Sequence, residues 1–159
     1  MSGIFATAGA TIDIGQVKAA QSANFVAANF AAQSWVNIAW VESIGAFGDE
    51  ATEVTFDAVG EGRTQKIKGV RNAGNIELVC GIATEDDGQA TLRGAQTEIF
   101  DYAFRITFDD APEGGTPSKR YFIAKVMTAR EQLDGANNVA KLIATLGINS
   151  NIVQVDAAP

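Results

Sequence analysis

The feature that most constrains the fold is a period-two pattern over residues 99–108. Large apolar side chains occupy every second position there, with polar residues between them: Phe100, Tyr102, Phe104, Ile106 and Phe108. Successive side chains of a β-strand point to opposite faces of the sheet, so this pattern predicts a strand with one buried face. The turn-rich residues 109–117 follow, and residues 120–129 are long enough to pair back as an antiparallel hairpin.

Further strand-like segments recur along the chain. Runs of β-branched and aromatic residues, separated by turns rich in Gly, Asn and Asp, predict strands over residues 35–44, 54–59, 64–70, 76–82, 139–148 and 152–155. Residues 85–95 open with acids and close near a glycine, which is the polarity that helix caps and the helix dipole favour. We therefore predict a mainly β chain with two packed antiparallel sheets, sandwich- or barrel-like, and one short flanking α-helix.

The first 34 residues differ from the rest in composition. They are rich in Ala, Gly and Asn, and large apolar residues are not spaced regularly enough to anchor a helix. We predict an N-terminal arm or loop over residues 1–34, with a short strand-like piece at residues 10–14. No internal repeat or linker divides the chain, so residues 1–159 are expected to form a single domain.

Composition argues against several classes of protein. The chain has no His, which removes the usual acid–base side chain, and its lone Cys80 cannot form an internal disulfide or a thiolate zinc site. We expect a non-enzyme with no cofactor, no metal site and no catalytic residue. The net charge of −7 opposes tight binding to nucleic acid, which depends on Lys and Arg.

The targeting signals in the sequence are weak. No apolar run approaches the roughly 20 residues of a membrane span, and the N-terminus lacks the basic start and apolar stretch of a secretory signal. We therefore expect no membrane partner and assembly in the cytoplasm.

Two groups of residues resemble sites for phosphate binding or catalysis, but the neighbouring sequence argues against both functions. Residues 114–120 resemble a phosphate loop, but the lysine enters a predicted strand and not a helix, which favours a hairpin turn. Asp109, Asp110 and Glu113 are the carboxylates on which an enzyme hypothesis would rest. No base, metal cluster or cofactor loop accompanies them, so the hypothesis has little support.

Charges are segregated across one predicted hairpin. The acids Asp49, Glu50 and Glu53 precede its turn, whereas Arg63, Lys66, Lys68 and Arg71 follow it. Two interpretations remain open. The charges can pair across the two strands of one chain, or they can form complementary contacts with another copy, because a head-to-tail interface needs two different surfaces.

Several motifs resemble the major tail proteins, or tail tube proteins, of long-tailed phages. The resemblance runs from about Trp35 to Val155, and two stretches carry most of it: Lys68-Gly69-Val70-Arg71-Asn72-Ala73-Gly74 before a strand, and Asp86-Asp87-Gly88-Gln89-Ala90-Thr91-Leu92 in the predicted helix. Residues 42–50, 54–56, 62–64, 121–122 and 126–131 add to it.

The resemblance implies a tail-tube fold and a structural role in the virion. Proteins of this family assemble as hexameric rings that stack into a tube, with DNA and the tape measure protein in the lumen and tail terminator and baseplate or distal tail proteins at the ends. The long hairpin of the family corresponds to residues 46–74 and implies inter-ring contacts through Phe47, Asp49, Glu50, Glu53, Arg63, Lys66, Lys68 and Arg71. Asp57 and Asp101 are the candidates for acids that line the lumen.

The strand pattern also permits a second interpretation. A β-sandwich module that binds a ligand or decorates a virion would show the same alternation, but it would stay monomeric or form small closed oligomers. The sequence alone leaves this alternative open.

Overall fold

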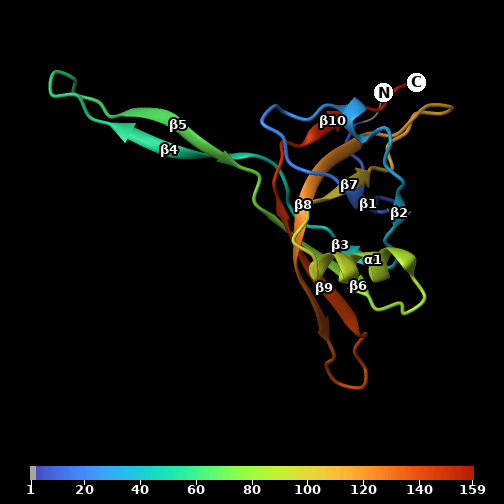
Figure 1. Cartoon of the computed structure of the whole chain (residues 1–159). Helices are drawn as coiled ribbons and strands as arrows, with labels where there is room; N and C mark the ends of the chain where they lie inside the picture. Colours follow the sequence, from blue (N-terminus) through green and yellow to red (C-terminus); the bar gives the residue numbers. More distant parts are fainter. Residues whose placement is uncertain (1–2) are drawn as a thin grey trace.

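The computed structural model describes residues 3–159, and most of its regular structure is β (Figure 1). Its one α-helix in that range is α1 (Asp87–Gln96), and a 3-10 turn, η1 (Ala27–Phe30), lies near the start. The strands are β1 (Thr11–Val17), β2 (Val36–Asn37), β3 (Val41–Ser43), β4 (Glu50–Phe56), β5 (Gln65–Asn72), β6 (Asn75–Gly81), β7 (Tyr102–Thr107), β8 (Lys119–Gln132), β9 (Lys141–Ile148) and β10 (Val153–Val155).

Eight strands form one antiparallel sheet in the order β2-β1-β7-β8-β9-β6-β3, with β10 paired to the start of β8. The long strand β8 joins its two halves. Ala124, near the middle of β8, pairs with Tyr102 of β7 on one side and with Ile148 of β9 on the other. The first half of β8 therefore belongs with β7 and the second half with β9.

The main sheet curls into a barrel-like shape. Its end strands, β2 and β3, lie at opposite ends of the strand order, yet only a few residues connect Asn37 to Val41. Four residues span at most about 14 Å, so the two ends of the sheet must approach each other. The curled sheet encloses an apolar cluster that we call the main core, which includes Ile12, Leu78, Phe104, Phe122 and Leu146. The helix α1 packs against β8, β1 and β2 and covers the main core.

Alternate residues of β7 and β8 serve two apolar clusters. Phe104 and Phe122 stack in the main core with ring centroids 5.6 Å apart and are fully buried. Ile123 points to the opposite face, where Phe25 and Phe30 from the N-terminal region cover it. Both faces of β7 and β8 are therefore buried in this region, one in each cluster.

The structure confirms the predicted fold class: mainly β, barrel-like, with two antiparallel sheets and one flanking helix. The strands that enclose the main core all belong to the curled main sheet. The second sheet is the β4–β5 pair, which projects from the body (Figure 1).

The strand-like piece predicted at residues 10–14 is present and longer than expected, whereas residues 18–34 form no strand, and residues 1–2 lie outside the described part. The strand β1 pairs with β7 over residues 11–17, and Ile12 and Ile14 are fully buried in the main core. The local sequence indicated the strand, but its extension to Val17 and its burial depend on pairing with β7, which the local sequence does not reveal.

The strand predicted over residues 35–44 is also interrupted. It forms β2 and β3, and Trp40 between them has φ of 59°, in the left-handed region that bulky residues rarely adopt. The break follows from the topology, since β2 must pair with β1 and β3 with β6 at the other end of the sheet.

Candidate assembly surface

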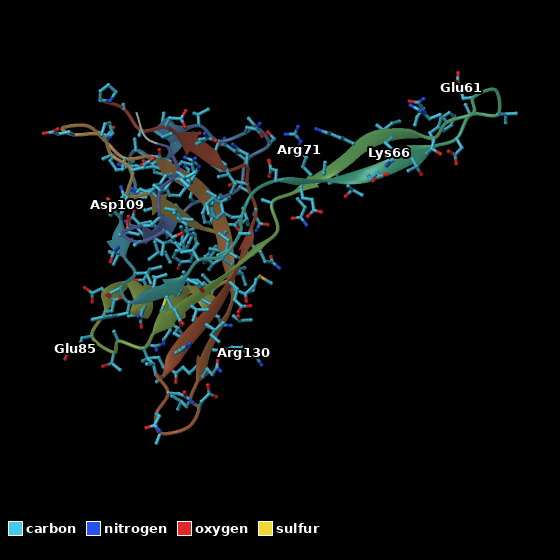
Figure 2. All side chains as sticks on the ribbon, turned by 180° about the vertical axis from the view of Figure 1, so that it is seen from behind. Glu61, Lys66, Arg71, Glu85, Asp109 and Arg130 are labelled. Carbon is cyan, nitrogen blue, oxygen red and sulfur yellow. The ribbon has the colours of Figure 1, made fainter. Side chains whose placement is uncertain are left out.

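The most prominent surface feature is the projecting pair β4–β5, which we call the hairpin arm (residues 50–72). Its strands pair from Glu50↔Asn72 at the base to Phe56↔Gln65 near the tip, with one irregularity between Ala51 and Glu53. Both figures show the arm extending away from the body (Figures 1 and 2). Among residues 3–159, neither strand of the arm packs extensively against any element but its partner strand.

One face of the hairpin arm is apolar and uncovered. Val54 lies opposite Ile67, and Phe56 lies two residues further along on the same face. The side chains of Phe56 and Ile67 are 60% and 56% exposed. A lone two-stranded hairpin is marginally stable in water, so an apolar face on such a ribbon is suited to contact with another molecule.

The sequence correctly predicted a strand at this position but not its environment. Alternation of Val54 and Phe56 with polar residues predicted a half-buried strand, whereas both residues are exposed in the structure. Alternation shows which side chains share a face of a strand, but it does not show whether another element covers that face.

The opposite face of the hairpin arm carries charge. Glu53 lies opposite Lys68, and its carboxylate is 3.7 Å from Lys66 Nζ. Because both groups are well exposed, the pair contributes at most about 1 kcal/mol. The structure thus brings Glu53, Lys66 and Lys68 together on one face. Of the other expected contact residues, Glu50 and Arg71 lie at the base of the arm and Arg63 lies in its exposed turn.

Two of the expected contact residues lie in the body at the root of the arm. Asp49 lines a small polar hollow with Arg71 and Asn149. Phe47 packs against the main core, where its ring stacks on Phe122 with centroids 6.5 Å apart. Phe47 therefore anchors the root of the arm within its own chain, and its contact with another subunit stays a prediction.

The two lumen candidates have different environments. Asp57 directly follows β4 and is exposed toward the tip of the hairpin arm. Asp101 is only 9% exposed, lies 3.2 Å from Lys125 Nζ, and accepts a 2.7 Å hydrogen bond from the Asn149 amide. The Asp101 charge is therefore buried and paired within the single chain, and its position relative to a channel stays a prediction.

One of the three carboxylates considered for catalysis, Asp110, stabilises a turn. Asp110 accepts hydrogen bonds from the Ser118 hydroxyl at 2.6 Å and the Ser118 amide at 2.8 Å. These bonds lower the pKa of Asp110 below its ordinary value. Asp110 therefore acts as a structural acceptor that closes the β7–β8 turn, which is a different role from a catalytic acid or base.

Residues 3–159 contain no cluster of three or more Cys, Asp or Glu side chains arranged to hold a metal ion. Within the same range, α1 is too short and too polar to cross a bilayer.

Comparison with solved structures identifies the fold of this chain, whereas comparison of its sequence does not. No protein-family model matches the sequence, and no curated protein matches it. Among solved structures, a chain from the 6-fold symmetrised anti-feeding prophage baseplate has a TM-score of 0.71 at 13% identity, over 98% of this chain and 98% of that one. A chain of the SPP1 tail tube has a TM-score of 0.68 at 13% identity, over 92% and 76%.

A third structure extends the comparison. A chain from the sheath/tube terminator of PVC, an extracellular contractile injection system, has a TM-score of 0.69 at 12% identity, over 97% of this chain and 98% of that one. The chain therefore has the tail-tube fold, and the resemblance found in the sequence is confirmed at the level of the fold.

Proposed function

We propose that this chain is a structural, non-enzymatic subunit of a phage tail tube, which self-assembles into stacked hexameric rings around a channel for DNA delivery. The observation that carries the proposal is the hairpin arm, whose apolar face has no cover within its own chain, on a body with the tail-tube fold. An arm of this kind gains a stable environment when it packs against a neighbouring subunit.

The hairpin arm is the proposed contact between rings. Glu53, Lys66 and Lys68 lie on one face and Val54, Phe56 and Ile67 on the other, so the arm can present an apolar surface and a charged surface to different neighbours. The contact is heterologous, because the arm of one copy meets a different surface of the next, and such contacts repeat without closing along the tube axis.

The charge of the chain supports a channel that does not retain DNA. Six copies with a net charge of −7 carry about −42 per ring, and acids near the lumen repel phosphates over a Debye length of about 8 Å. Asp57 remains a candidate for such an acid. DNA and a tape measure protein would then occupy the lumen transiently without adhering to its wall.

The proposed partners and location follow from the same role. Subunits would fold in the host cytoplasm, stack into the tail of the virion, and meet terminator proteins at one end and baseplate or distal tail proteins at the other. No cofactor is needed, since packing between copies performs the function.

Negative-stain electron microscopy of the purified chain at rising concentration tests this proposal. We expect rings and regularly striated tubes, together with a mass by light scattering that grows in multiples of the ring. A chain that stays monomeric at high concentration would instead support the β-sandwich decorating module and refute a tube-forming role.

Charge reversal tests the part assigned to the arm. Lys66→Glu, Lys68→Glu and Arg71→Glu together should impair polymerisation while circular dichroism shows a folded monomer. The conservative triple variant with Arg at 66 and 68 and Lys at 71 keeps the charge and serves as the control. Normal tubes from the reversed variant would discard the assignment of these residues to the inter-ring contact.

A second role is a ring that ends a tube. The name of the PVC structure, a sheath/tube terminator, favours this candidate, since its fold matches nearly the whole chain. Single rings that do not stack under any condition would identify a terminator, whereas continuous tubes identify the tube subunit.

A further inference from the structure

A surface hollow lies beside the turn that joins β8 to β9. It has a volume of about 630 Å³, and its walls come from three places: Trp40 and Glu42 at β3, Gly81 and Ile82 at the end of β6, and residues within 134–141. Trp40 and Val139 form its apolar part and are 75% and 66% exposed. Asp134 and the ion pair between Lys141 and Glu42 form its polar rim.

Trp40 is held in this exposed position by a buried network. Its carbonyl oxygen accepts a 2.8 Å hydrogen bond from the amide of Gly81. The preceding residue, Ala39, donates its amide to Asp86 at 3.1 Å and accepts from the Gln89 side chain at 2.9 Å. Gln89 has no exposed surface, and its remaining hydrogen bonds, to Ala83 N and Gly81 O, satisfy both ends of its amide.

The network maintains a conformation that is unfavourable for tryptophan. A bulky residue in the left-handed region costs of the order of 1–3 kcal/mol, and Trp40 recovers little of this by burial within its own chain. Asn or Gly would make the same corner at lower cost. Tryptophan is one of the residues enriched among those that contribute most to binding at the centres of protein interfaces, so its presence here indicates a contact surface.

We infer that the hollow at Trp40 is the docking site for the apolar face of the hairpin arm of a second copy of this chain. The inference rests on the proposed function and adds to it the surface that receives the arm. Phe56 and Ile67 on the arm are exposed to solvent in the single chain, and so are Trp40 and Val139 in the hollow. Docking would bury the apolar side chains of both surfaces.

The shape of the chain and the separation of apolar from charged side chains on the arm both support a contact between two copies. The hairpin arm extends away from the body on a different side from the β8–β9 turn in both views, so an arm does not reach the hollow of its own chain (Figures 1 and 2). Lys66 and Lys68 lie on the opposite face of the arm from Phe56 and Ile67, so the apolar face can enter the hollow while the charged face stays toward solvent. Two different surfaces on one chain are the requirement for head-to-tail stacking.

Site-directed cross-linking tests the contact. Ile67→Cys and Val139→Cys are introduced together into the full chain, and assembled material is treated with a short bis-maleimide. The native Cys80 does not interfere, because burial raises the pKa of its thiol to about 11 and no part of it is exposed. The control pairs Ile67→Cys with Ile99→Cys, since Ile99 is 80% exposed and lies outside the hollow.

A ladder of covalent multimers from the Ile67–Val139 pair, with little from the control pair, is expected. Tubes that form normally but give no ladder, or equal ladders from both pairs, overturn the docking site and leave the proposed function intact. A wild-type chain that forms no rings or tubes overturns both.

A second measurement uses Trp40→Ala with Ile99→Ala as its matched control. Loss of a central interface tryptophan should raise the concentration at which tubes form by about tenfold or more, while the control stays within about twofold. Circular dichroism and the thermal midpoint establish that both variants are folded. An unchanged assembly threshold for folded Trp40→Ala refutes the inference.

Discussion

Replacing Gly88 with Ala should destabilise this protein, although the same change usually stabilises a helix. The first turn of α1 passes so close to β2 that a Cβ at Gly88 would overlap the carbonyl oxygen of Asn37 and lie 2.7 Å from the Cα of Ile38. Helix propensity offers a gain of less than about 1 kcal/mol, whereas overpacking against a backbone that cannot rotate away costs about 1–3 kcal/mol. We expect a net loss of about 2 kcal/mol.

Gly94 provides a matched control within the same helix. A Cβ at Gly94 meets no atom within 4 Å, so Gly94→Ala should stabilise the protein by about 0.5–1 kcal/mol. The two variants should therefore differ by about 3 kcal/mol, or roughly 6–12 °C in thermal midpoint for a chain of this length. Urea unfolding followed by circular dichroism measures both. Equal or higher stability of Gly88→Ala would show that α1 does not approach β2 as described.

Three further changes test other parts of the molecule. Gln89→Ala removes the partner of three backbone groups and should cost about 2–4 kcal/mol in urea unfolding. Arg105→Met leaves the buried Asp13 carboxylate without its 2.6 Å ion pair and should cost about 2–4 kcal/mol. Ser118→Ala should raise the pKa of Asp110 toward its ordinary 3.8, as followed by NMR titration of its carboxyl carbon.

Controls for these changes come from exposed positions. Lys66→Met breaks the exposed pair with Glu53 and should change stability by less than about 0.5 kcal/mol, in contrast with Arg105→Met. Gln96→Ala, on the exposed side of α1, should also change stability by less than about 0.5 kcal/mol, and it is the control for Gln89→Ala. If either buried variant matches its control, the corresponding network contributes less than its geometry indicates.

The Asp110 prediction has a defined sign with pH. Its pKa is lowered in the folded state, so its contribution to stability is complete above the unfolded pKa near 3.8 and is lost as pH falls through the lower folded value. The stability gap between wild type and Ser118→Ala should therefore narrow in strong acid, where the loss of the Ala157 amide hydrogen bond to Ser118 Oγ remains. A gap between them that widens as pH falls below 3.8 would contradict this assignment.

The sequence by itself determined most of the secondary structure, because the evidence for it is local. The alternation around Phe104 specified β7, and the acids before Gly88 specified the start of α1, where the Asp86 carboxylate accepts the Gln89 amide hydrogen bond. Both signals operate over a few residues, which is the range within which strand pleating and helix capping act.

Only the tertiary structure decided which of these elements are covered. Ile12 and Phe56 both lie in alternating segments, yet Ile12 is buried against β7 and Phe56 is exposed on the hairpin arm. Alternation tells which side chains share a face, but the cover for that face comes from residues distant in sequence. The break at Trp40 has the same origin, since the closure of the curled sheet required it and no local propensity did.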